Sequence, residues 1–221
     1  MLRRSFFITL VFGVLLATVL VSGCDLLGDD LTPSIGNVDL IGYEPHIQPI
    51  LDRQCASCHG GSRPRAGLSL EGWTQLIQGS EFGEVVIPFA SEDSRMIQKL
   101  KRVGDDTHPF DQGKDRLSED EVNLLTRWVD EGAIGPLGAV PFSNSINLAY
   151  IAHADEPYVS VLDMDAFVVV RRLDLTQHGF SERARVHHVA VEPDGAFWYA
   201  SVGSYRIGDL EGVVKFNRDN G

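Results

Sequence analysis

Apolar residues recur three and four positions apart in several separate stretches of the first half of the chain. Such spacing places side chains on one face of a helix, and we therefore predict four short helices. The predicted helices cover residues 45–59, 71–78, 94–102 and 118–132. Pro49 suits the first turn of the first helix, because the N–H that proline lacks has no partner there. Gly60 and Gly61 predict the end of the same helix.

The last of these stretches has the clearest signals. Residues 118–121 fit a capping box, and Leu117 and Val122 are placed as the hydrophobic pair that flanks such a cap. A stripe of apolar side chains then predicts the face that packs on a core, with Gly132 near the end of the helix. Together the four helices predict a small all-α domain over residues 42–135.

The pattern changes after this domain. Residues 136–147 are rich in Gly, Pro and Ser, which indicates a linker. Residues 148–221 alternate between apolar and polar positions, as half-buried antiparallel strands do. Pro193-Asp194-Gly195 has the chemistry of a turn between two of them. The predicted fold class is therefore multidomain α + β, with an all-α domain followed by antiparallel strands.

Two segments of the strand region resemble the YVTN-type β-propeller repeats of exported proteins: "YIAHADEPYVSVLDMDAFVVVRRL" and "HHVAVEPDGAFWYAS". Tyr150 and Tyr199 lie 49 residues apart, close to the spacing of four-stranded blades. The resemblance implies an incomplete β-propeller of about one and a half blades over residues 148–221. Because a propeller typically needs at least four blades, we expect the chain to be the N-terminal part of a longer protein or a truncated gene product. A small sandwich or a stand-alone meander is the alternative.

The chain begins as an export signal does, with two arginines before an apolar run that ends in small residues. The stretch Val21-Ser22-Gly23-Cys24 resembles the lipobox of bacterial lipoproteins, which implies that Cys24 is acylated and anchored to a membrane. We predict a signal peptide over residues 1–23, a tether over 24–41 and a periplasmic location. An ordinary cleaved signal or an uncleaved anchor is the alternative.

Cys55, Cys58 and His59 form a C-x-x-C-H run, for which a zinc site, a redox dithiol, a disulfide and a covalent haem are the candidates. A four-ligand zinc site usually shows a second ligand pair at short spacing, and the other close pair, His187-His188, is distant in sequence. A thioredoxin-like dithiol opens a helix after a strand, whereas this run ends a helical stretch. Haem c accounts for all three residues, as two thioether cysteines and the proximal iron ligand.

Three stretches around this run resemble class I cytochrome c domains of larger exported proteins: "IQPILDRQCASCHG", "GLSLEGW" and "LSEDEVNLLTRWVDEGA". The resemblance implies one covalent haem c and an axial ligand on the loop before the last helix. Such domains usually place a Met-Pro pair there, but this chain has His108-Pro109. We predict His108 as the sixth iron ligand and Met96 as the alternative. An exposed His108 beside an open iron would instead favour small-molecule chemistry.

The net charge of the chain indicates which class of partner to expect. The formal net charge is −12, which argues against nucleic acid as a partner and suits a basic redox protein. We therefore predict a membrane-anchored, electron-transferring cytochrome fused to a propeller module. The alternative is a haem-based sensor of redox state or gaseous ligands with the propeller as its interaction module. No nucleophile–base pair or phosphate loop is readable, so an oxidoreductase site is expected only in propeller blades beyond this chain.

The adjacent histidines His187 and His188 fall within a predicted strand. Neighbouring residues of a strand point to opposite faces, so a bulge would be needed for both to bind one metal. We expect a structural role for them.

Overall fold

The computed structural model describes residues 40–101, 108 and 117–218. The predicted signal peptide and Cys24 lie outside these residues. Leu40–Gly221 forms one compact unit, in which the helices come first and the strands follow, so the mixed α/β character is confirmed. Within the described part of the chain, no helix is both long and apolar enough to cross a membrane.

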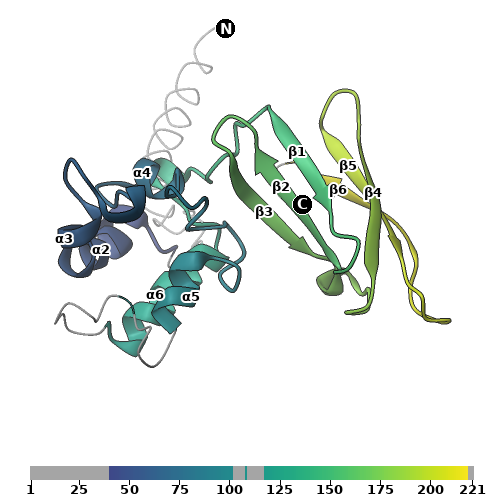
Figure 1. Ribbon diagram of the computed structural model, residues 1–221, viewed down its shortest axis with the longest axis horizontal. Helices are drawn as coiled ribbons and strands as arrows, with labels where there is room; N and C mark the ends of the chain where they lie inside the picture. Colours follow the sequence, from purple (N-terminus) through teal and green to yellow (C-terminus); the bar gives the residue numbers. More distant parts are fainter. Residues whose placement is uncertain (1–39, 102–107, 109–116, 219–221) are drawn as a thin grey trace, which may run out of the picture. The chain divides into compact units, whose positions relative to one another are not determined.

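The predicted helices are present, and the first of them is divided (Figure 1). One π-helical turn at Tyr43–Ile47 leads into α2 at Gln48–Gln54, and α3 at Ala56–His59 follows after Cys55. Pro49 lies in the first turn of α2, as predicted. The other helices are α4 (Trp73–Ile77), α5 (Arg95–Lys101) and α6 (Glu119–Asp130).

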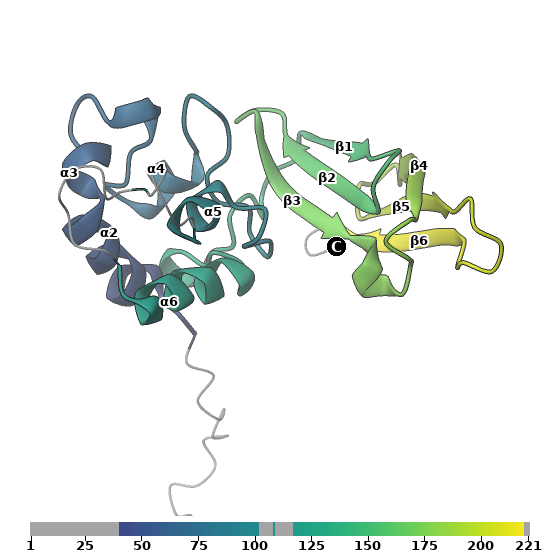
Figure 2. The ribbon, with the colours of Figure 1, turned by 60° about the horizontal axis from the view of Figure 1, so that its bottom comes forward.

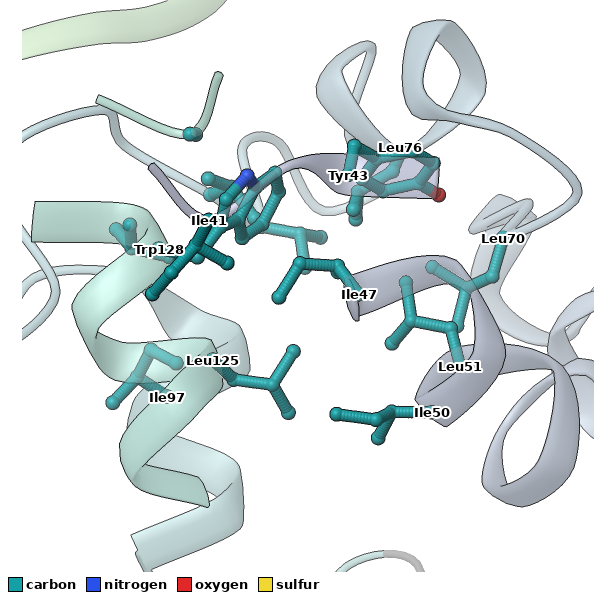
Figure 3. Packing of buried hydrophobic residues seen from close by; sticks show 14 of the residues in the cluster. Ile41, Tyr43, Ile47, Ile50, Leu51, Leu70, Leu76, Ile97, Leu125 and Trp128 are labelled. Carbon is teal, nitrogen blue, oxygen red and sulfur yellow. The ribbon is translucent and has the colours of Figure 1, made fainter. Parts of the chain in front are cut away.

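These helices surround one apolar core (Figure 3). Its fully buried members include Ile47, Leu51, Leu76, Leu125 and Trp128. The indole N–H of Trp128 donates to the carbonyl oxygen of Ile134 at 2.9 Å, so the polar atom of this buried ring has a partner. The stripe predicted on the last helix is therefore the face that α6 turns to the core.

The predicted capping box at the start of α6 is confirmed. The Ser118 hydroxyl accepts a hydrogen bond from the Glu121 N–H at 3.2 Å, and the Glu121 carboxylate accepts one from the Ser118 N–H at 2.8 Å. Glu121 also pairs with Arg53 of α2, so the same carboxylate caps one helix and ties it to another. Three acidic residues lie in the first turn of α6, where their negative charge is stabilised by the positive end of the helix dipole.

We expect Ser118→Ala to lower the free energy of unfolding by about 1 kcal/mol, because the Glu121 N–H in the first turn of α6 loses the hydroxyl oxygen that accepts its hydrogen bond. Chemical denaturation followed by far-ultraviolet circular dichroism measures this difference. Ser118→Asp keeps an oxygen acceptor at the cap and should remain close to wild type. Equal stability of the alanine variant and the wild type would contradict the role of the cap.

The second half of the unit consists of two three-stranded antiparallel sheets, ordered β1-β2-β3 and β4-β5-β6 (Figures 1 and 2). Consecutive strands pair in both sheets. The predicted Pro193-Asp194-Gly195 turn joins β4 to β5, with Gly195 at φ +71°. The strands are β1 (Leu148–Ala152), β2 (Tyr158–Asp163), β3 (Val168–Asp174), β4 (Arg185–Val191), β5 (Phe197–Gly203) and β6 (Gly212–Asn217).

Both sheets contribute to one strand-side core. Val159 of β2 belongs to the same buried cluster as Trp198 of β5 and Phe216 of β6. Trp198 and Phe216 stack with ring centres 4.3 Å apart, and Tyr150 of β1 lies 5.0 Å from the Trp198 ring. Neither sheet could bury its apolar face alone, so the shared cluster stabilises the pair.

The repeat suggested by the tyrosines is wrong. Tyr150 lies on the first strand of one sheet, whereas Tyr199 lies on the middle strand of the other. The structural repeat is the whole three-stranded sheet, whose first residues, Leu148 and Arg185, are 37 positions apart. This period is hard to see in the sequence because equivalent turns of the two sheets differ in length. The turn between β5 and β6 is longer than the turn between β2 and β3.

Candidate functional site

The C-x-x-C-H run closes the first group of helices. The N–H of Cys55 donates to Leu51 O at 2.8 Å, and the N–H groups of Cys58 and His59 donate to Cys55 O at 3.1 and 3.0 Å. The helical path therefore continues through the motif. Residues three and four apart on such a path share one face, so Cys58 and His59 lie one turn beyond Cys55 on its side. Both cysteines are partly buried.

A hydrogen bond fixes the ring of His59. Its Nδ1 lies 3.2 Å from the carbonyl oxygen of Arg65. A carbonyl oxygen only accepts, so Nδ1 carries the ring proton and the Nε2 lone pair is left for another partner. Metal-binding histidines are commonly oriented by such a bond to their second nitrogen.

The chain then folds back tightly after His59. A Cβ atom on Gly60 would lie 2.7 Å from the carbonyl oxygen of Ala56, so no larger residue fits there without a shift of the helix end. The Gly61 N–H donates to the Glu71 carboxylate at 2.8 Å, and the Leu70 N–H donates to His59 O at 2.7 Å. The two predicted stop residues thus also bring the following loop against the motif.

A cavity of about 440 Å³ opens beside this motif. Its wall is mostly apolar and includes Leu51, Leu68, Leu70, Val85, Leu100, Leu117 and Leu125. The side chains with polar or ligating atoms that also reach it are Cys55, His59, Ser80, Arg95, Met96, Lys99 and His108. Among the described residues, no carboxylate lines the cavity.

His108 and His59 meet across this cavity. Their ring centres are 5.8 Å apart, with an angle of 50° between the ring planes. Two imidazoles that share one metal through bonds of about 2 Å each have ring centres roughly 6 Å apart. The observed separation of the two ring centres is close to this value.

The alternative ligand Met96 also lines the cavity, and it packs against the buried core of the helices. The structure thus brings four of the predicted site residues to one cavity: Cys55, His59, Met96 and His108. Cys58 is not part of the lining, although it shares the helix face of Cys55.

Arg95 and Lys99 of α5 are cavity residues that the sequence reasoning missed. The available signal was their spacing of four, next to Met96 and Leu100 at the same spacing. Those two rows of side chains lie side by side on one helix, so a cavity contacted by one row is within reach of the other.

The paired histidines of the strand region occupy a β-bulge. Val186 pairs with Val202 and His188 pairs with Ser201, so His187 is the extra residue. A β-bulge of this kind is what two neighbouring strand residues would need in order to bind one metal together. However, in the residues that the structure describes, no group of three or more His, Cys, Asp or Glu side chains is placed to hold a metal ion.

Comparison with known families agrees with the geometry. Residues 55–108 match the family model described as Planctomycete cytochrome C, a span that begins at Cys55 and ends at His108. With the C-x-x-C spacing of Cys55 and Cys58, the match supports a c-type cytochrome domain that binds haem covalently. Neither the curated proteins nor the solved structures contain a match to the chain.

Proposed function

We propose that the chain holds one haem c through Cys55, Cys58 and His59, and transfers electrons with His108 as the sixth iron ligand. The observation that carries the proposal is the cavity that His59 and His108 share, with their ring centres 5.8 Å apart. An iron bound on both sides is suited to electron transfer, whereas an open iron is suited to binding gaseous ligands. The geometry therefore favours electron transfer over the sensing alternative.

The residues around the cavity suit this cofactor. A volume of about 440 Å³ falls within the range of cofactor pockets, and an apolar wall with few polar groups is typical of them. Thiols and imidazoles are the side chains that attach haem c and bind its iron. Bound haem would supply a one-electron couple.

The proposal gives a role to each of the main residues around the cavity. Cys55 and Cys58 supply the two thioether sulfurs, and the Arg65 carbonyl holds the His59 ring with Nε2 available. Leu51 and Leu125 contribute apolar wall that keeps water away, which strengthens electrostatic interactions inside the cavity. The acidic chain favours a basic redox partner.

The test is expression of the full chain in a bacterial host that matures c-type cytochromes. We expect a haem-stained band on a denaturing gel, a low-spin spectrum and reversible one-electron reduction. Rapid electron exchange with a basic cytochrome, slowed by added salt, would support the proposed partner class. A band without haem would reject the cytochrome function, and a high-spin spectrum would shift the function to ligand sensing.

The propeller is part of the same proposal. Two successive three-stranded sheets with strands in chain order, packed through a shared core, support the start of a propeller more than a stand-alone meander. Their offset of 37 positions is close to the length of a short propeller repeat. Each sheet has one strand fewer than a full blade.

The proposed anchor is Cys24. We expect Cys24→Ser to abolish lipidation and to release the protein from the membrane, while the haem content stays unchanged because residues 55–59 are untouched. Mass spectrometry of the mature N-terminus and fractionation of cells measure both effects. An unmodified N-terminus well away from position 24 would reject the lipoprotein assignment.

A further inference from the structure

We infer that Arg95 and Lys99 bind the two propionate carboxylates of the haem and thereby set its reduction potential. This inference rests on the proposed function. It concerns two side chains that neither the C-x-x-C-H run nor the matched family description assigns to a task.

The two cations face the cavity together. Both line it, and they lie one helical turn apart on α5, beside the equally spaced Met96 and Leu100. Lys99 is half-buried, and Arg95 is exposed. Lysine and arginine commonly lay their apolar stems on an apolar surface and extend the charge to its edge. On the side of α5 that lines the cavity, Met96 and Leu100 therefore form an apolar row, and Arg95 and Lys99 form a charged row next to it.

Neither cation has a partner within the described chain. The side chains of Arg95 and Lys99 make no hydrogen bond, ion pair or ring contact among the described residues, although the chain carries 31 acidic residues. The neighbouring Lys101, in contrast, pairs with Glu92 at 2.6 Å. Because no carboxylate lines the described cavity, a ligand with its own carboxylates would supply the missing negative charge.

The attachment chemistry indicates which edge of the haem this is. Cys55 and Cys58 bind the vinyl-bearing edge, so the carboxylates extend from the opposite edge of the macrocycle. α3 and α5 lie apart in both views, and each contributes residues to the cavity lining (Figures 1 and 2). The cations of α5 thus lie where the carboxylates are expected, and an arginine can bind a carboxylate through two N–H groups.

The expected effect on the midpoint potential follows from the charges of the haem and of the two side chains. Ferric haem carries one more positive charge than ferrous haem, so nearby cations disfavour the ferric form and raise the midpoint potential. Removing them should lower it. For the double variant Arg95→Gln/Lys99→Gln, we expect the equilibrium constant for reduction to fall about tenfold, which corresponds to about 59 mV for one electron.

The experiment uses the full-length haem-loaded protein. Potentiometric titration and resonance Raman spectra of the propionate bending vibration are recorded for wild type, Arg95→Gln, Lys99→Gln, the double variant and Lys99→Arg. Lys101→Gln is the matched control, because it removes one charge from the same helix outside the cavity lining. We expect lower potentials and an altered propionate band in the glutamine variants of 95 and 99, and near wild-type values in Lys99→Arg.

The outcomes separate the two proposals. Haem-stained, low-spin variants whose potentials shift no more than that of Lys101→Gln, with an unchanged propionate band, would overturn the role of Arg95 and Lys99 and leave the cytochrome function intact. A wild type without covalent haem would overturn both.

Discussion

The double variant Cys55→Ala/Cys58→Ala is expected to lose all covalently attached haem. Each thioether needs one of these sulfurs, and they are the two cysteines of the described chain. A single variant, Cys55→Ala or Cys58→Ala, keeps at most one thioether and should show a much weaker band. Haem staining of a denaturing gel measures attachment directly, because non-covalent haem dissociates in detergent.

Two controls make this result specific. His59→Ala keeps both sulfurs but loses the imidazole that the Arg65 carbonyl orients, so its spectrum should change more than its attachment. Ser57→Ala changes an exposed residue between the cysteines and should stain like wild type. A double-alanine variant that still stains would contradict attachment at this motif.

The His108→Ala variant is expected to change the iron from low-spin to high-spin and to bind carbon monoxide readily when reduced. The reason is the loss of the second imidazole, whose ring centre lies 5.8 Å from that of His59. The ferric wild-type protein should lack the weak absorption band near the red edge of the visible spectrum that a methionine sulfur ligand produces. A second imidazole also holds the potential lower than a methionine sulfur does.

The matched control is Met96→Leu, which exchanges two side chains of similar volume in the same cavity wall. It should leave the spin state unchanged and cost less than about 1.5 kcal/mol of stability. A sulfur band in wild type that disappears in Met96→Leu would assign the sixth position to Met96. A wild type that is already high-spin would contradict both ligands.

The helices and strands were predictable because their signals are local. The capping box at Ser118 and Glu121, Pro49 in a first turn and the Pro193-Asp194-Gly195 turn each depend on residues within a few positions of one another. The C-x-x-C-H run is equally local. One helical turn places its three side chains together regardless of the rest of the fold.

The repeat in the strand region was not predictable in this way. The two tyrosines are alike in sequence, but strand order puts them at different positions of their sheets. Turn lengths and the bulge at His187 shift the register without a matching change in composition. Pairing between strands therefore decided the repeat.

By itself, the sequence determined the order of helices and strands, the cap of α6 and the C-x-x-C-H run on which the proposed haem attachment rests, because neighbouring residues specify each of these. Only the tertiary structure decided that His108 reaches the His59 ring and that Arg95 and Lys99 line the same cavity without an acidic partner in the described chain. Those relations join segments that are distant in sequence. Packing of α5 and α6 on the core, rather than any local pattern, brings them to one site.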